Sequence, residues 1–108
     1  MAGCATTPIP NESIAVAKSS VQRAEQSGAP EFAAVQFAAA QDKLAQAEKA
    51  ADRRDSQTAT MMAEQSNIDA RLSEAMAEQQ RSHRAAMEFD ASMQALRQES
   101  SQNTQTTH

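Results

Sequence analysis

The sequence predicts an all-α protein: a three-helix antiparallel bundle with a long, overhanging, coiled-coil-like third helix. Of its 108 residues 40% are hydrophobic, but only 3% are aromatic, and there are only two Gly and three Pro. Sandwiches and barrels need β-branched and aromatic strands with frequent turns, so this composition excludes them. Abundant Ala, Gln, Glu and Met favour helices, and we expect these helices to pack closely through alanine.

The first predicted helix covers about residues 11–27. Its apolar residues recur every three or four positions, which places them on one face of a helix. They are Ile14, Ala17, Val21 and Ala24. We expect this helix to end at Gly28, because glycine readily adopts left-handed backbone, and Pro30 suits the first turn of the next helix.

The second predicted helix covers about residues 30–53 and has the same spacing on one face. Its stripe consists of Ala33, Phe37, Ala40, Leu44, Ala47 and Ala51. A polar turn follows, in which Asp55 is placed to cap the third helix.

The third predicted helix covers about residues 56–99, a segment without Gly or Pro. Steps of three and four alternate along its whole stripe, which is typical of left-handed coiled-coil packing. The stripe consists of Thr58, Met61, Gln65, Ile68, Leu72, Ala75, Gln79, Ser82, Ala86, Phe89, Met93 and Leu96. Residues 100–108 are polar and lack this period, so we predict a disordered tail.

The lengths of the helices predict a partner-binding surface. At ~1.5 Å per residue the second helix spans roughly 35 Å and the third roughly 65 Å, so the second covers only about half of the third. Apolar residues beyond that cover would be exposed in a single chain. They are Ala86, Phe89, Met93 and Leu96. We expect them to bind an envelope protein or a second copy of the chain.

The N-terminal residues predict a lipid anchor. Met1-Ala2-Gly3-Cys4 is similar to the end of a bacterial lipoprotein signal, in which small residues precede the cysteine that is lipidated. The usual first residue of that box is Leu, so we interpret Met1 as an initiator that replaces a removed signal peptide. Residues 1–10 are thus predicted to be a lipobox remnant and flexible tether. Ala5 after Cys4 favours the periplasmic face of the outer membrane, by analogy with enteric bacteria.

Several segments carry a family resemblance over roughly residues 10–78. They are Ala29-Pro30-Glu31-Phe32-Ala33, Ala38-Ala39-Ala40-Gln41-Asp42-Lys43-Leu44-Ala45-Gln46-Ala47, Ala63-Glu64-Gln65-Ser66 and Asp69-Ala70-Arg71-Leu72-Ser73-Glu74-Ala75. The chain resembles the bacterial envelope lipoprotein family of domain of unknown function 4398. This resemblance implies a periplasmic lipoprotein and no catalytic residues. Relatives often have Gly and an aromatic residue where this chain has Arg54 to Gln57.

The sequence offers little for catalysis or nucleic-acid binding. The net charge is -4 and the basic residues are scattered, which disfavours nucleic acid. No nucleophile-elbow, phosphate-loop or zinc-protease motif is present, so we predict no enzyme activity and no cofactor. The chain ends in Thr107-His108 and lacks the C-terminal Lys through which some small lipoproteins join peptidoglycan. We therefore expect any contact with peptidoglycan to be indirect.

Two other functions stay open. His83 and Met87 lie four residues apart on one helix face, and imidazole with thioether suits Cu(I), so copper sensing or binding is one alternative. One chain supplies too few donors to close such a site, and no metal is predicted for a monomer. The second alternative is a periplasmic chaperone or secretion-pilot lipoprotein.

Overall fold

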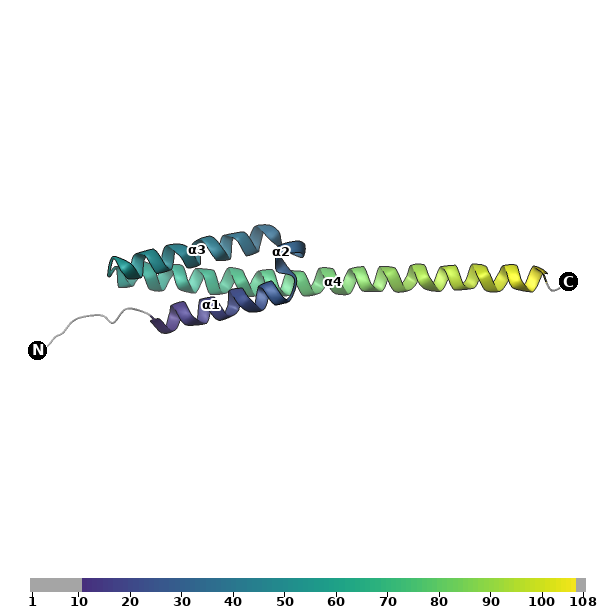
Figure 1. The fold of residues 1–108 in the computed structure, drawn as a ribbon, viewed down its shortest axis with the longest axis horizontal. Helices are drawn as coiled ribbons and strands as arrows, with labels where there is room; N and C mark the ends of the chain where they lie inside the picture. Colours follow the sequence, from purple (N-terminus) through teal and green to yellow (C-terminus); the bar gives the residue numbers. More distant parts are fainter. Residues whose placement is uncertain (1–10, 107–108) are drawn as a thin grey trace, which may run out of the picture. The chain divides into compact units, whose positions relative to one another are not determined.

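The structure is a computed structural model, and it is all-α over the residues that it describes, 11–106 (Figure 1). Four helices follow one another: α1 (Asn11–Gln26), α2 (Ala29–Phe32), α3 (Ala34–Asp52) and α4 (Ser56–Thr106). The chain divides into two structural units, one ending at Glu78 and the other beginning at Gln79. The lipobox remnant and tether predicted over residues 1–10 lie outside the described residues.

The first turn between helices forms as the sequence predicts. Gly28 has left-handed backbone, with φ 91° and ψ 16°, which a residue without a Cβ adopts at no steric cost. The N–H groups of Glu31 and Phe32 donate to the Gly28 carbonyl at 3.1 and 2.9 Å. The next helix begins at Ala29, so Pro30 lies within its first turn, where its missing N–H leaves no hydrogen bond unmade.

The prediction of a single helix over residues 30–53 is wrong, because the structure has two helices there, α2 and α3. Ala33 leaves the helical region, with φ -144° and ψ 50°, although its N–H still donates to the Ala29 carbonyl. Ala29 and Ala33 are both buried, together with Phe37, in one cluster. No Gly or Pro marks this break, so tertiary packing overrides the helix propensity of the segment here.

The second turn places Asp55 as the predicted cap of α4. The Thr58 backbone N–H donates to Asp55 Oδ1 at 3.2 Å. Hydrogen bonds from the Thr58 side chain and backbone hold the pKa of the Asp55 carboxyl below its ordinary value, with a smaller contribution from the charge of Arg53. The ionised carboxylate therefore satisfies an N–H group that the first turn of a helix leaves without a partner.

Arg54 has left-handed backbone, with φ 61°, a conformation that favours glycine. Left-handed backbone costs a residue with a Cβ about 1–2 kcal/mol, so Arg54→Gly is expected to stabilise the first unit by up to about 1 kcal/mol. Chemical denaturation followed by circular dichroism measures the change. Arg53→Gly removes the same charge at a position with φ -82°, and is expected to destabilise. An equal effect of both variants would contradict this explanation.

The prediction of a disordered tail from residue 100 is wrong over residues 100–106, which are helical. α4 continues to Thr106, beyond the predicted end at 99. Nothing in this segment breaks a helix, because it contains neither Gly nor Pro. The Thr104 hydroxyl donates to the Ser100 carbonyl at 2.8 Å, one turn earlier. Residues 107 and 108 lie outside the described part of the chain.

The predicted core stripe is confirmed for α1, and that of the second segment is confirmed except at its end, where Ala50 is buried and the predicted Ala51 is only half-buried. In α1, Ala17 and Ala24 are fully buried, while Ile14 and Val21 pack against the core. In α3, the stripe that includes Phe37 also faces the core, and Phe37 is 6% exposed. The buried residues of α3 are Phe37, Ala40, Ala47 and Ala50, and Ala33, which precedes α3, is also buried.

The core assignment was wrong for the part of α4 that belongs to the first unit. The stripe predicted to pack there contains Met61, Ile68 and Leu72, which are 46%, 63% and 47% exposed. A second stripe is buried instead, and it consists only of Ala and Ser. Its residues are Ala59, Ala63, Ser66, Ala70, Ser73 and Ala77. We call this the small-residue face of α4.

Within the first unit, α1 and α3 run beside the start of α4 (Figure 1), and the small side chains of this face are buried against them. Ala17, Ala47 and Ala63 form one buried cluster from the three helices. The buried serines on α4 have hydrogen-bond partners: Ser66 donates to the Ala40 carbonyl at 2.7 Å, and Ser73 to the Ala70 carbonyl at 2.8 Å. The helices thus meet without burying an unsatisfied hydroxyl.

Polar contacts surround this alanine core and fix its helices to one another. The Lys43 ammonium lies 2.6 Å from the Asp69 carboxylate, and both side chains are partly buried. Ser20 of α1 donates to the Asn67 side chain of α4. These contacts join α1 and α3 to opposite flanks of the small-residue face.

Candidate interaction surface

The second unit contains the four residues predicted to bind a partner. Within it α4 is the only element described, and every described side chain from 79 to 104 is exposed. Ala86, Phe89, Met93 and Leu96 follow one another at steps of three, four and three. This spacing places them on one face of the helix. We call them the Phe89 stripe.

The large side chains of the Phe89 stripe present apolar surface to solvent. Phe89 is 66% exposed, Leu96 57% and Met93 37%. Single exposed apolar residues are common on proteins, but a contiguous row is typical of an interaction site. The predicted exposure of these residues is therefore observed, while their binding to a partner stays a prediction.

Charged residues border the Phe89 stripe and none lies on it. Asp90 and Arg97 each follow a stripe residue along the sequence, so they lie at its edge. On the other side of the helix, Arg84 and Glu88 form an exposed ion pair with a 3.7 Å separation. Such a pair adds little stability, since water screens it. An apolar centre with a polar rim is the usual arrangement of a protein–protein contact surface.

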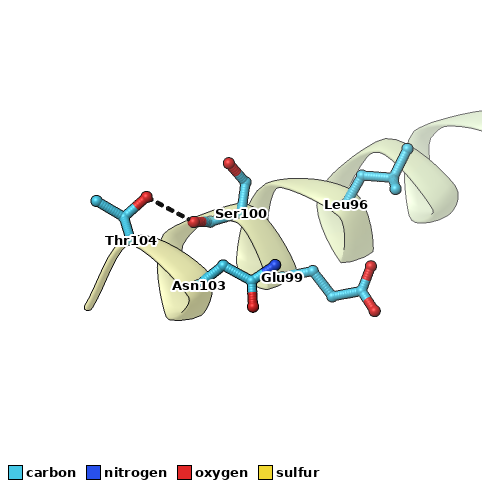
Figure 2. Close-up of a pocket in the computed structure, with 5 residues that line it drawn as sticks. All are labelled: Leu96, Glu99, Ser100, Asn103 and Thr104. Carbon is cyan, nitrogen blue, oxygen red and sulfur yellow. Dashed lines mark hydrogen bonds between the residues drawn. The ribbon is translucent and has the colours of Figure 1, made fainter. Parts of the chain in front are cut away.

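Two shallow depressions adjoin the end of this stripe. One has a volume of about 510 Å³ and is lined by Leu96, Glu99, Ser100, Asn103 and Thr104. Figure 2 shows these five side chains, together with the hydrogen bond between Thr104 and Ser100. The other depression, of about 580 Å³, also includes Leu96. Both are lined by residues of a single helix, so neither encloses a small molecule as a catalytic pocket does.

A second exposed apolar surface, which was not predicted from the sequence, lies on the first unit. Met61, Ile68 and Leu72 project from the side of α4 opposite its small-residue face. We call this the Ile68 face. The sequence does contain a signal for it, because Ala and Ser recur with the same alternating steps from 59 to 77. One helix with two such stripes has to leave one of them outside the core.

The candidate metal ligands lie on the surface of the second unit. His83 is exposed and Met87 is 60% exposed. Within residues 11–106, no three His, Cys, Asp or Glu side chains come together in a way that would hold a metal ion. The structure thus places the two candidates on one helix and adds no further ligand of these types to them.

Across the described helices, none combines the length and the hydropathy that a membrane-spanning segment needs. Cys4, the predicted lipidation site, lies outside the described residues.

Comparison with known proteins identifies a family and nothing more specific. The family described as Domain of unknown function (DUF4398) matches residues 12–89. The match includes Phe89 and ends before Met93 and Leu96. Searches of curated proteins and of solved structures found no match.

Proposed function

We propose that this chain, which belongs to the DUF4398 family, is a non-enzymatic, lipid-anchored scaffold or adaptor on the periplasmic face of the bacterial outer membrane. Cys4 carries the anchor, and the Phe89 stripe binds a helix or groove of a protein partner. The observation that supports this function most strongly is the stripe itself, a row of large apolar side chains that contact no other element within the second unit.

In this proposal the first unit is a three-helix antiparallel bundle that serves as a support. Two buried clusters favour this arrangement. One joins Ala24, Phe37 and Ala77, and the other joins Ala17, Ala47 and Ala63. The order of contacts is reversed between α1 and α3, and again between α3 and α4, as antiparallel neighbours with short turns require.

The localisation follows from the proposed role of Cys4. A cysteine preceded by Ala2 and Gly3 matches the small-residue pattern before a lipidated cysteine. One acyl chain binds a membrane only weakly, so stable anchoring needs more than one. Processing of bacterial lipoproteins supplies these further acyl chains.

The test is photo-crosslinking in cells, with the protein expressed behind a lipoprotein signal peptide and a photoreactive residue at position 89. A probe at position 91 is the matched control, since Ala91 is exposed but lies on the opposite side of the helix. We expect cross-links to another envelope protein from 89 and few from 91. Phe89→Ala should weaken that complex by about 10- to 100-fold, because burying an aromatic side chain contributes about 1.5–3 kcal/mol.

Two results would contradict the proposal. Equal cross-linking from 89 and 91 would show that the Phe89 stripe does not select the partner. Unchanged membrane fractionation of a Cys4→Ser variant would show that the cysteine is not the anchor.

A further inference from the structure

The Ile68 face is the strongest unassigned feature of the first unit. Ile68 is 63% exposed, more than Met61 or Leu72, although β-branched aliphatic residues are usually buried. Gln65 lies between Met61 and Ile68 in the same alternating steps, and Ala75 follows Leu72. The residues of this face therefore recur at alternating steps of three and four, the spacing at which two helices pack against each other.

Charges beside the Ile68 face argue against a membrane surface as its occupant. Glu64, Arg71 and Glu78 follow one another at steps of seven along one edge, and all three are exposed. Asp69 lies at the other edge, where Lys43 pairs with it at 2.6 Å. Helices that lie on bilayers carry a basic rim that attracts anionic lipid, whereas this edge is mostly acidic.

The order of charges along that edge indicates a second copy of the same chain. Glu64 and Arg71 are separated by two helical turns and have opposite signs. In an antiparallel pair of identical helices centred between Ser66 and Asn67, each Glu64 meets the partner's Arg71. Two equivalent ion pairs then form around one two-fold axis, as symmetry requires.

We propose that the first unit forms an antiparallel homodimer through the Ile68 face. In this register Met61 of one copy packs beside Leu72 of the other, and Ile68 packs beside Gln65. Thr58 and Ala75 form the outer layer at each end. Each layer contains an apolar side chain from at least one copy, and the flanking charges attract.

Other self-pairings bring like charges together. A parallel dimer in register places Glu64 beside Asp69 of the other copy, which carries the same charge. An antiparallel dimer shifted to put Ile68 beside Leu72 places Arg71 opposite Arg71 and Glu64 opposite Glu78. Flanking charges of this kind set the orientation of paired helices, so the register centred between 66 and 67 is favoured.

The test is a charge exchange in the full chain, with mass measured by sedimentation at a series of concentrations. Arg71→Glu and Glu64→Arg each replace two attractive pairs with two repulsive ones, so each should weaken the dimer by at least about tenfold. The double variant Glu64→Arg/Arg71→Glu restores both pairs and should dimerise like the original. Arg97→Glu, which makes the same charge change in the second unit, is the control and should have no effect.

Disulfide formation tests the orientation, in a Cys4→Ser background that removes the native thiol. A mixture of Thr58→Cys and Ala75→Cys chains should form mixed disulfide dimers, because these positions face each other in the antiparallel register. Ala75→Cys alone should not, since its two thiols would lie roughly 25 Å apart. A monomeric original chain, a double variant that stays dissociated, or efficient self-linkage through position 75 would each overturn the proposal. None of these results bears on the Phe89 stripe, so the proposed function is tested separately.

Discussion

Ala70→Leu is expected to destabilise the first unit strongly. Ala70 is fully buried on the small-residue face of α4. A leucine there would have to fit where the helices approach one another, and overpacking of this kind costs about 1–3 kcal/mol or more. Urea denaturation of the full chain, followed by circular dichroism, should show a lower midpoint for this variant.

Ala75→Leu is the matched control for this substitution. It makes the same change on the same helix, but Ala75 is exposed. At a protein concentration low enough to keep copies apart, its unfolding midpoint should stay within experimental error, or rise slightly because leucine is a good helix former. If Ala75→Leu destabilises and Ala70→Leu does not, the two faces of α4 have been assigned the wrong way round.

Phe37→Ala is expected to have the largest effect of any single truncation. Phe37 is only 6% exposed and packs with Ala24, Ala29, Ala33 and Ala77. These alanines are too small to fill the space that an aromatic ring leaves, and the larger Val21, Phe32 and Met76 pack at the border of the cluster, so the loss should be about 3–5 kcal/mol. In a small helical unit this is enough to leave much of the population unfolded at room temperature.

The control for Phe37→Ala is Val35→Ala, two residues earlier on the same helix. Val35 is 77% exposed, so its removal takes little apolar surface out of the core. Melting followed by circular dichroism should separate the two variants clearly. A Phe37→Ala chain that melts like the Val35→Ala chain would show that the ring contributes little to the core.

The sequence predicts the core faces of α1 and α3 because each helix has one apolar stripe to bury. In α3 the stripe through Phe37 has no competitor of equal period, and the structure buries it. Gly28 and Asp55 also predict their turns, since each residue type performs a known role in backbone geometry or capping. These features depend on the residue type at one position, so they can be predicted from the sequence.

The buried face of α4 was missed because two stripes share the same period. Ranking them by side-chain size selects Met61, Ile68 and Leu72, whereas the fold buries Ala63, Ala70 and their neighbours. Helices that approach one another closely need small residues at their contact. Which face of α4 makes such a contact can be told only when the helices packed against it are known. The break at Ala33 has the same origin, since packing rather than a breaker residue produces it.

The sequence pattern of the small-residue face also predicts where the buried part of α4 ends. Continuing its steps beyond Ala77 leads to Gln80 and Arg84, which are polar and exposed. The other stripe becomes apolar again at Ala86, as its sequence pattern predicts. The exposure of the Phe89 stripe could therefore be predicted, but the identity of its partner could not, because apolar side chains at this spacing fit many helices.

The central claim is that α4 packs through its small-residue face and leaves its large apolar residues outside. The most direct test is thiol labelling of Ile68→Cys and Ala70→Cys in a Cys4→Ser background, at a concentration low enough to keep copies apart. In the folded protein we expect rapid labelling at 68 and strong protection at 70, with equal rates in denaturant. Protection at 68 with rapid labelling at 70 would contradict the claim.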